Sequence, residues 1–259
     1  MKKLALLLAL VLALGMIGCV YAEEETAPAL LAYFTFDDAE NLGADASGNG
    51  NDLVKAINPD GIQAVEGVKG GAAYFGGTSG LLAKDDANND FIDTYEGKAF
   101  TVSFWAKVDI ENARTGNSRA VDHGINGSDE GFTMLVNKSV AEDGTVSVFS
   151  ISKVGGSDWW SSASNVTGDP AEWHQYTMVY DPEENLVVTF IDGERIKEVF
   201  ADEDENTKSA FTFCVGGDWA QWDWFNGGNR EVTMEGFTGA IDEVKIFAGA
   251  VYDFEIING

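Results

Sequence analysis

The chain has 259 residues, 45% of them hydrophobic, and a formal net charge of −27. This acidity disfavours nucleic acid and anionic membranes as partners, because like charges repel. It favours cations, calcium above all, whose ligands are carboxylate and carbonyl oxygens.

The first 22 residues have the pattern of a secretory signal peptide. A basic start precedes an apolar run over residues 4–18, which is too short for a comfortable membrane span, and a small-x-small cleavage site ends at Ala22. We therefore expect a secreted, extracellular protein with no direct membrane span. Residues 16–19, Met-Ile-Gly-Cys, also resemble a bacterial lipobox, so the alternative is a lipid anchor at Cys19.

Residues 23–28 form a short acidic lead-in, and residues 29–259 are expected to form a single domain. No Pro-rich or Ser-rich linker and no fixed repeat divides them. Once the leader is removed, Cys214 is the only cysteine, so no intramolecular disulfide can form and the fold must depend on its hydrophobic core.

Short strands separated by Gly, Asn and Asp turns make up most of this domain. We predict strands at residues 31–36, 100–108, 145–153, 174–180, 186–191, 194–200, 232–234 and 240–247. Alternation in the second strand puts five apolar residues on one face: Phe100, Val102, Phe104, Ala106 and Val108. Asp192-Gly193 predicts a tight hairpin turn. No segment after the leader has a sustained helical period, so the fold class is all-β, a two-sheet antiparallel sandwich.

Four blocks in order resemble those of bacterial laminin G-like domains of the concanavalin A-like lectin and glucanase type. They are YFTFDD (33–38) with DASGNGND (45–52), FTVSFW (100–105), WHQYTMVYD (173–181) and GAIDEVKIF (239–247). The resemblance implies a jelly-roll β-sandwich over nearly the whole domain. It also implies a carbohydrate-binding or adhesion function, a structural calcium ion near these blocks, and a core position for Trp105 and Trp173. His174 is expected to be structural.

The predicted calcium site joins the two ends of this domain. Asp37 ends the first strand and Asp242 lies on the last strand, and these strands pair in a jelly roll. The loop at 45–52, rich in Asn, Asp and Gly, leaves carbonyl groups free, and we assign Asn49 and Asn51 to the site with the two aspartates. The alternative is that these are turn and edge residues that cap their own backbone.

Five tryptophans lie among small polar residues, where a folding core does not readily explain them: Trp159, Trp160, Trp219, Trp222 and Trp224. Indole faces stack on sugar rings, while polar neighbours bind the hydroxyl groups, and we assign Asp223 and Asn226 to that role. The loop at 122–127 is a further candidate rim. The alternative for Trp222 and Trp224, which are two residues apart, is core packing on one strand face.

No catalytic motif stands out. The Glu-x-Asp-x-x-Glu pattern of jelly-roll glucanases and the Gln-x-His pattern of jelly-roll lyases are both missing. We therefore predict a non-catalytic, lectin-like module that binds a glycan or polysaccharide and carries a structural Ca²⁺. The alternative is a protein–protein adhesion or structural cell-surface domain that binds a surface protein, and a polysaccharide-active enzyme is the least favoured.

Overall fold

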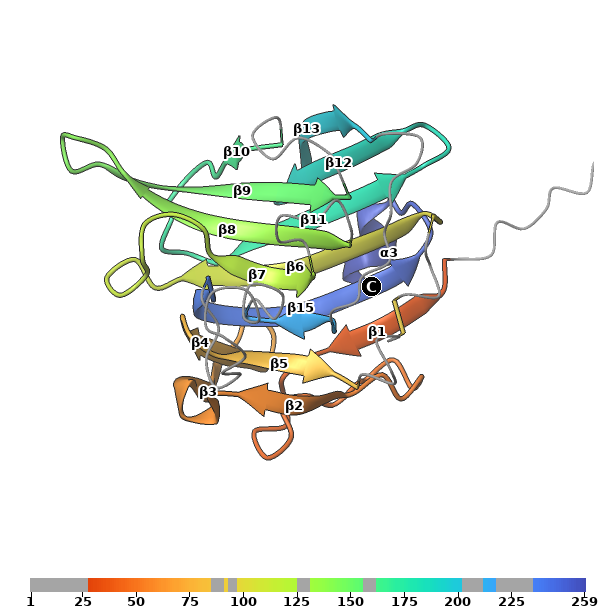
Figure 1. Ribbon diagram of the computed structural model, residues 1–259, viewed down its shortest axis with the longest axis horizontal. Helices are drawn as coiled ribbons and strands as arrows, with labels where there is room; N and C mark the ends of the chain where they lie inside the picture. The colour runs from red at the N-terminus through yellow and green to blue at the C-terminus, as the bar shows by residue number, and fades with distance from the viewer. Residues whose placement is uncertain are drawn as a thin grey trace, which may run out of the picture.

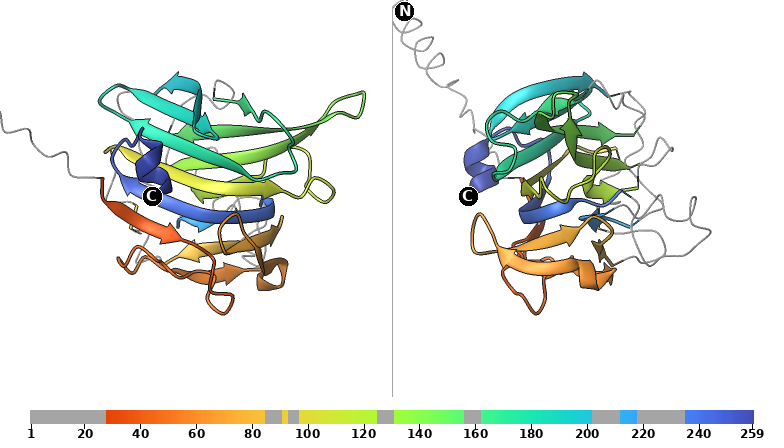
Figure 2. Two further views of the ribbon diagram at one scale, coloured as in Figure 1. Left: turned by 180° about the vertical axis from the view of Figure 1, so that it is seen from behind. Right: turned by 90° about the vertical axis from the view of Figure 1, so that its left-hand side faces the viewer.

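The computed structural model describes residues 28–84, 91–92, 97–124, 131–155, 162–201, 212–217 and 235–259. Within these residues, two antiparallel sheets of eight and seven strands pack face to face as a β-sandwich (Figures 1 and 2). The predicted signal peptide and acidic lead-in lie outside the described residues, apart from Pro28. The all-β jelly-roll class predicted from the sequence is confirmed.

The eight-stranded sheet carries both ends of the domain. In spatial order its strands are β13 (Glu194–Phe200), β12 (Leu186–Ile191), β11 (His174–Asp181), β6 (Phe100–Val108), β15 (Thr238–Ala248), β4 (Gly71–Gly76) and β3 (Ile62–Glu66). β1 (Leu30–Phe34) also pairs with β15, with Phe34 opposite Val244. The first and last strands therefore pair, as expected for a jelly roll.

The seven-stranded sheet forms the second layer. Its strands are, in spatial order, β10 (Ser164–Asn165), β9 (Val146–Val154), β8 (Phe132–Val140), β7 (Arg119–His123), β14 (Cys214–Val215), β5 (Gly80–Ala83) and β2 (Leu53–Ile57). In the described ranges the helical elements are a 3₁₀ turn, η1 (Pro59–Gly61), and one short helix, α3 (Phe254–Asn258). No helix in these ranges is long and apolar enough to cross a membrane.

The strands with clear sequence patterns lie where predicted. β6, β12 and β13 have the predicted bounds, and β1, β9, β11 and β15 differ by a residue or two at their ends. Asp192 and Gly193 both have positive φ, 53° and 77°, which is the type I′ geometry that a two-residue hairpin favours. The predicted strand at 232–234 lies outside the described residues.

The core lies between the sheets and is built from alternating positions. The five apolar residues predicted for one face of β6 are all buried there, and Phe34, Phe75 and Phe132 pack with them. Burial of each phenylalanine stabilises the fold by about 1.5–3 kcal/mol. Trp105 does not share this face: it is half-buried on the opposite side of β6, so its predicted core position was wrong. Trp173, just before β11, is also only half-buried.

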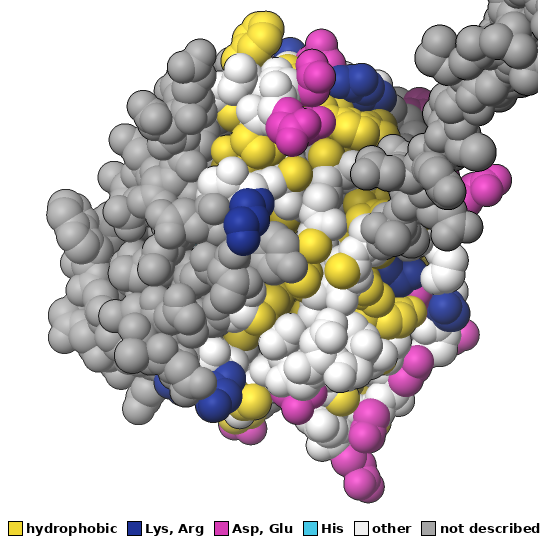
Figure 3. Space-filling view, turned by 90° about the vertical axis from the view of Figure 1, so that its right-hand side faces the viewer, with side chains coloured by type: hydrophobic (Ala, Val, Ile, Leu, Met, Phe, Trp, Pro, Cys, Tyr) yellow, Lys and Arg dark blue, Asp and Glu magenta, His cyan; other side chains and the backbone are white. Residues whose placement is uncertain are grey.

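The charge of the chain is visible on the surface. Figure 3 shows acidic side chains along the upper and lower edges of one face, with hydrophobic side chains gathered between them.

Candidate functional site

All seven predicted glycan-binding residues lie outside the described residues: Trp159, Trp160, Trp219, Trp222, Asp223, Trp224 and Asn226. The strands that flank their segments are described. Residues 156–161 follow β9, and residues 218–234 connect β14 to β15. β9 and β14 both belong to the seven-stranded sheet, so the described strands that precede these segments lie in that sheet.

The strand register separates the two faces of this sheet, because directly opposed residues point the same way. One row reads Leu81, Val215, Val121, Met134 and Ser152. Its apolar members belong to the core, so this row faces inward. The next row reads Leu82, Cys214, Asp122, Thr133 and Lys153, and it therefore faces outward. Its side chains are nonetheless buried, so the outer face is covered rather than an open platform.

A charged network lies on this outer face. The Arg119 guanidinium, 1% exposed, donates to Asp122 Oδ1 at 2.9 Å and to Thr133 Oγ1 at 3.1 Å. Its other terminal nitrogen donates to Glu235 Oε2 at 3.3 Å. One cation therefore contacts two carboxylates from different parts of the chain.

Burial makes this network sensitive to change. Asp122 is fully buried, and desolvation raises the pKa of its carboxyl although the Arg119 charge acts in the opposite direction. A buried ion pair need not add net stability, but removal of one partner leaves a buried charge uncompensated. The folded state therefore depends on Arg119 for its stability as long as Asp122 and Glu235 are present.

The network also holds the ends of the candidate binding segments. Asp122 Oδ2 accepts from the Gly124 amide at 3.2 Å, immediately before residues 125–130. Glu235 directly follows residues 218–234, and its carbonyl accepts from the Arg119 amide at 2.7 Å. The two attachment points lie at opposite ends of β7, which spans roughly 13 Å.

The loop at 122–127 was predicted to be an exposed rim, and its first two residues do not fit this prediction. Asp122 and His123 belong to strand β7 and are both fully buried, so neither is an exposed rim residue. The His123 ring lies 5.5 Å from the Phe132 ring on the core side. His174 is held structurally, with Nδ1 2.7 Å from Asp192 Oδ2 and Nε2 2.9 Å from the Asp169 carbonyl.

Asp37 and Asp242 flank one loop, residues 67–71. The Gly71 amide donates to Asp37 Oδ1 at 2.7 Å, and the Lys69 amide donates to Asp242 Oδ2 at 3.0 Å. A Cβ on Gly70 would lie 2.1 Å from Asp37 Oδ1, and one on Gly67 would lie 2.4 Å from Asp242 Oδ2. Glycine suits both positions, because a Cβ on Gly67 would also lie 2.3 Å from the Gly71 carbonyl oxygen and Gly70 has a φ of 72°.

Asn49 and Asn51 lie elsewhere. Their side-chain amides donate to the Leu30 and Leu31 carbonyls at the start of β1, with distances of 2.7–3.1 Å. That end of β1 pairs with Phe247, about five residues and roughly 16 Å along β15 from Asp242. The structure therefore does not bring the four assigned residues into one site.

The asparagine loop is organised by its own aspartate. Asp45 accepts from the amides of Tyr33, Ser47 and Asn51. Burial alone would raise the pKa of Asp45, but these hydrogen bonds, with that of the Ser47 hydroxyl, lower it. The turn-and-cap alternative raised for this loop describes Asp45 well.

The oxygen atoms around Asp242 provide some, but not all, of the ligands that a cation needs. Its side chain is buried, desolvation raises its pKa to about 6, and its oxygens accept from the backbone amides of Lys69 and Glu243. Nearby positive charge would relieve this desolvation. Within the described ranges no group of three or more His, Cys, Asp or Glu side chains could hold a metal. Carbonyl oxygens and water would therefore have to complete a calcium shell around Asp37 and Asp242.

Solved structures share this architecture at low sequence identity. Domain 4 of AbnA, an extracellular GH43 arabinanase from Geobacillus stearothermophilus, was solved with arabinotriose. It is 20% identical, with a TM-score of 0.56 over 90% of this chain and 98% of that one. The binding domain of botulinum neurotoxin DC, solved with SialylT, is 13% identical with a TM-score of 0.59 over 89% of this chain.

The same toxin domain was also solved with rat synaptotagmin II, and there the identity is 14% and the TM-score 0.55. This chain spans about half the length of these toxin domains, since it covers 50% of each. These likenesses establish the fold alone.

Comparison with curated protein sequences finds no match. A family model described as the concanavalin A-like lectin/glucanases superfamily, laminin G type, matches residues 75–257. That range is well over half of the chain and contains most strands of both sheets. The chain therefore belongs to the laminin G group of the concanavalin A-like lectin/glucanases superfamily.

Proposed function

We propose that this protein is a non-catalytic glycan-binding module whose sugar site is formed by the tryptophan-bearing segments, residues 156–161 and 218–234, which follow β9 and β14 of the seven-stranded sheet in the chain. The observation that carries this proposal is the buried network of Arg119, Asp122 and Glu235. It contacts Gly124, which precedes residues 125–130, and Glu235, which follows the tryptophan-bearing residues 218–234, and so holds one flanking residue of each segment at β7. Rigid ends pre-organise a binding surface and lower the entropic cost of association.

The residue types in these segments suit a sugar ring. An indole face covers the axial C–H bonds of a pyranose, and aspartate and asparagine side chains accept or donate to its hydroxyl groups. Arabinotriose in the arabinanase domain and SialylT in the toxin domain are bound by proteins of the same fold. These complexes support a glycan as the ligand class here.

We further propose that the protein is secreted, or lipid-anchored through Cys19, and that a structural Ca²⁺ binds between Asp37 and Asp242. The ion would hold the 67–71 loop against Asp37, which follows β1, and Asp242, which lies within β15. The chemistry it supplies is neutralisation of buried negative charge, not catalysis.

A protein partner is the second candidate. The toxin domain solved with rat synaptotagmin II uses the same fold in a complex with a protein. Aromatic patches suit protein interfaces as well as sugars, so the residue types alone do not separate the two. A hydrolase or lyase function is least favoured, because the sequence carries none of the carboxylate or histidine patterns that these enzymes use.

The test is a glycan array followed by calorimetric titration of each hit. The double variant Trp222→Ala/Trp224→Ala is expected to lose binding while its thermal midpoint stays within a few degrees of wild type. Trp173→Phe, a change at the start of β11 in the other sheet, is the matched control and is expected to bind normally. Binding to a protein that no glycan competes away would favour the adhesion function, and unchanged glycan binding by the double variant would refute the site.

A further inference from the structure

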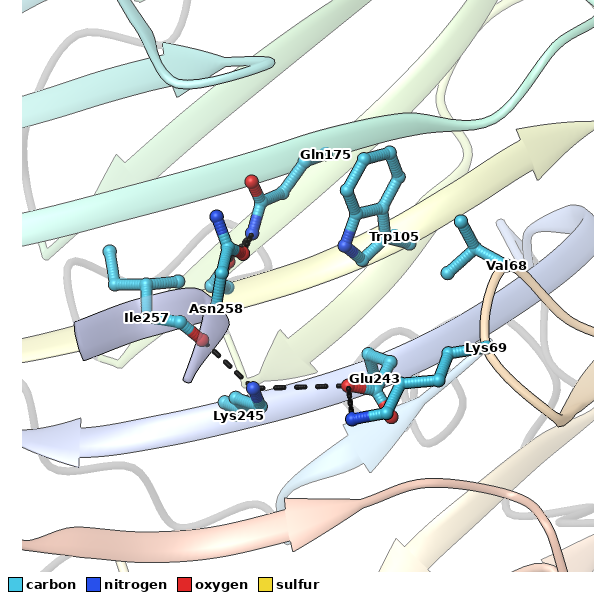
Figure 4. Close-up of a pocket in the computed structure, with 9 residues that line it drawn as sticks. Val68, Lys69, Trp105, Gln175, Glu243, Lys245, Ile257 and Asn258 are labelled. Atoms are coloured by element: carbon cyan, nitrogen blue, oxygen red, sulfur yellow. Dashed lines mark hydrogen bonds and ion pairs between the residues drawn. The ribbon is translucent and has the colours of Figure 1, made fainter. Parts of the chain in front are cut away.

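A cavity lies on the outer face of the eight-stranded sheet. It has a volume of about 210 Å³. Its floor is made by Ser103 and Trp105 of β6, with Gln175 opposite Trp105 on β11. Helix α3 forms one wall through Ile257 and Asn258, and the 67–71 loop forms the other (Figure 4).

Helix α3 is fixed firmly enough to serve as a wall. Phe254 packs against Phe190 with ring centroids 5.2 Å apart, and Ile257 is buried against Phe247 and Val251. Lys245 Nζ donates to the Ile257 carbonyl at 2.8 Å. The cavity is therefore bounded by packed elements on both sides.

The acidic group of the cavity is already occupied by protein partners. Glu243 Oε1 accepts from the Tyr33 hydroxyl at 2.6 Å, and its Oε2 lies 3.8 Å from Lys245 Nζ and 3.6 Å from Lys69 Nζ. Lys245 in turn bonds the helix carbonyls. Neither of these two side chains has much capacity left for a ligand.

The groups that remain are mostly donors. Lys69 has 69% of its side chain exposed, and Glu243 at 3.6 Å is its only charged contact in the described part of the chain. The Trp105 indole N–H and the Asn258 amide N–H groups make no hydrogen bond within the described residues, and Figure 4 shows the indole nitrogen on the side facing Asn258 and Lys245. Gln175 uses its N–H groups on Ser103 and Asn258, so only its carbonyl oxygen is left as an acceptor.

We propose that this cavity binds one acidic sugar residue, a pyranose ring that carries a carboxylate. Lys69 at the mouth pairs with the carboxylate, the indole and Val68 cover the ring carbons, and the free amide groups meet the hydroxyls. The volume is below the about 300–1,000 Å³ typical of sites for drug-sized ligands, so it suits a single ring. Among the residues that line the cavity, Lys69 and Lys245 outnumber Glu243, and Lys69 is the one whose charged side chain is largely exposed at the mouth.

This site is separate from the described residues that flank the proposed glycan-binding segments, which contact β7 of the seven-stranded sheet, so the two proposals can fail independently. The test is an NMR titration of the full chain with D-glucuronate, D-glucose and acetate as probes. The indole N–H resonance of Trp105 is the readout, and the spectrum of Trp105→Phe identifies it. Glucuronate is expected to shift this resonance, while glucose and acetate bind at least about tenfold more weakly.

Lys69→Gln is expected to lower the glucuronate affinity about fivefold to tenfold, because it removes the charged donor and leaves an exposed side chain of similar length. Lys197→Gln is the matched control, an exposed lysine on β13 four strands away from β15, and its affinity is expected to equal that of wild type. No shift of the Trp105 resonance with glucuronate would overturn the proposal. Equal affinity of Lys69→Gln and wild type would also overturn it, and so would equal binding of glucose or acetate.

Discussion

Replacement of Arg119 by methionine tests the buried network most sharply. Arg119 is the cation that contacts both Asp122 and Glu235, at 2.9 and 3.3 Å, and Asp122 has no exposed surface. Removal of one partner of a buried ion pair costs about 3–5 kcal/mol, because the remaining charge is desolvated and uncompensated. For a domain of more than 200 residues this corresponds to a fall in thermal midpoint of roughly 6–20 °C.

The measurement is urea unfolding followed by circular dichroism, compared with Asp122→Asn and with the double variant Arg119→Met/Asp122→Asn. The amide of asparagine can still accept from the Gly124 amide, but it carries no charge. The double variant is therefore expected to recover at least half of the loss of Arg119→Met, a coupling that two independent sites would not show.

The loss in Arg119→Met also depends on pH. Burial raises the pKa of Asp122, so its ionisation disfavours the folded state and stability falls as pH rises through that pKa. Without Arg119 the fall is steeper, and the destabilisation is larger at pH 8 than at pH 5. A cost below about 1 kcal/mol at pH 8, or additive behaviour of the double variant, would refute the network as described.

Two further predictions concern the eight-stranded sheet. Asp242→Asn is expected to abolish any calcium-induced rise in thermal midpoint. Burial raises the pKa of Asp242 to about 6, so in EDTA the wild-type protein should lose stability as pH rises from about 4 through 6. Asp242→Asn should not show this loss. Midpoints from pH 4 to 8 check this, and a calcium response that survives in Asp242→Asn would contradict the metal site. Lys245→Met should free α3 at a cost of about 1.5–3 kcal/mol, because it removes charged hydrogen bonds to the helix carbonyls. Increased amide exchange at Ile257 checks this, and unchanged protection there would contradict it.

The fold was predictable where the chain alternates over a long stretch. β6, β12 and β13 have strict period-two patterns or a defined hairpin turn, so their bounds follow from the sequence. The sequence did not predict β2–β5, β7, β8, β10 or β14. β3 lies at an edge of its sheet and exposes several residues, whereas β7 carries charges on its outer face that hide its apolar pattern. A short strand is recognisable only through the neighbours that bury it.

Trp105 shows how a family expectation can override a local pattern. The alternation of β6 put Phe104 and Ala106 on the core face, and Trp105 between them must then point away. The period-two pattern of β6 therefore already indicated that Trp105 lies on the outer face of the sheet, where it lines the cavity beside α3. The expectation from the family that this tryptophan faces the core led to the wrong prediction.

The candidate site was only partly predictable, because several of its contacts join residues that are far apart in the sequence. Pairing of the first and last strands placed Asp37 and Asp242 at one loop, as the jelly-roll topology requires. Asn49 and Asn51 instead bind carbonyls at the far end of β1, a choice set by the turn around Asp45. Arg119 and Glu235 are 116 residues apart, and no local sequence pattern predicts that they form an ion pair.

A thermal melt shows whether the protein binds a glycan. The protein is melted in EDTA, in excess calcium, and in calcium with a panel of soluble glycans that includes arabinotriose and sialylated oligosaccharides. A glycan present at 100 times its dissociation constant stabilises the folded state by about 2.7 kcal/mol, or roughly 5–11 °C here. We expect such a rise for one glycan class, and we expect the variant Trp222→Ala/Trp224→Ala to lose it. An unchanged midpoint with every glycan of the panel would contradict it.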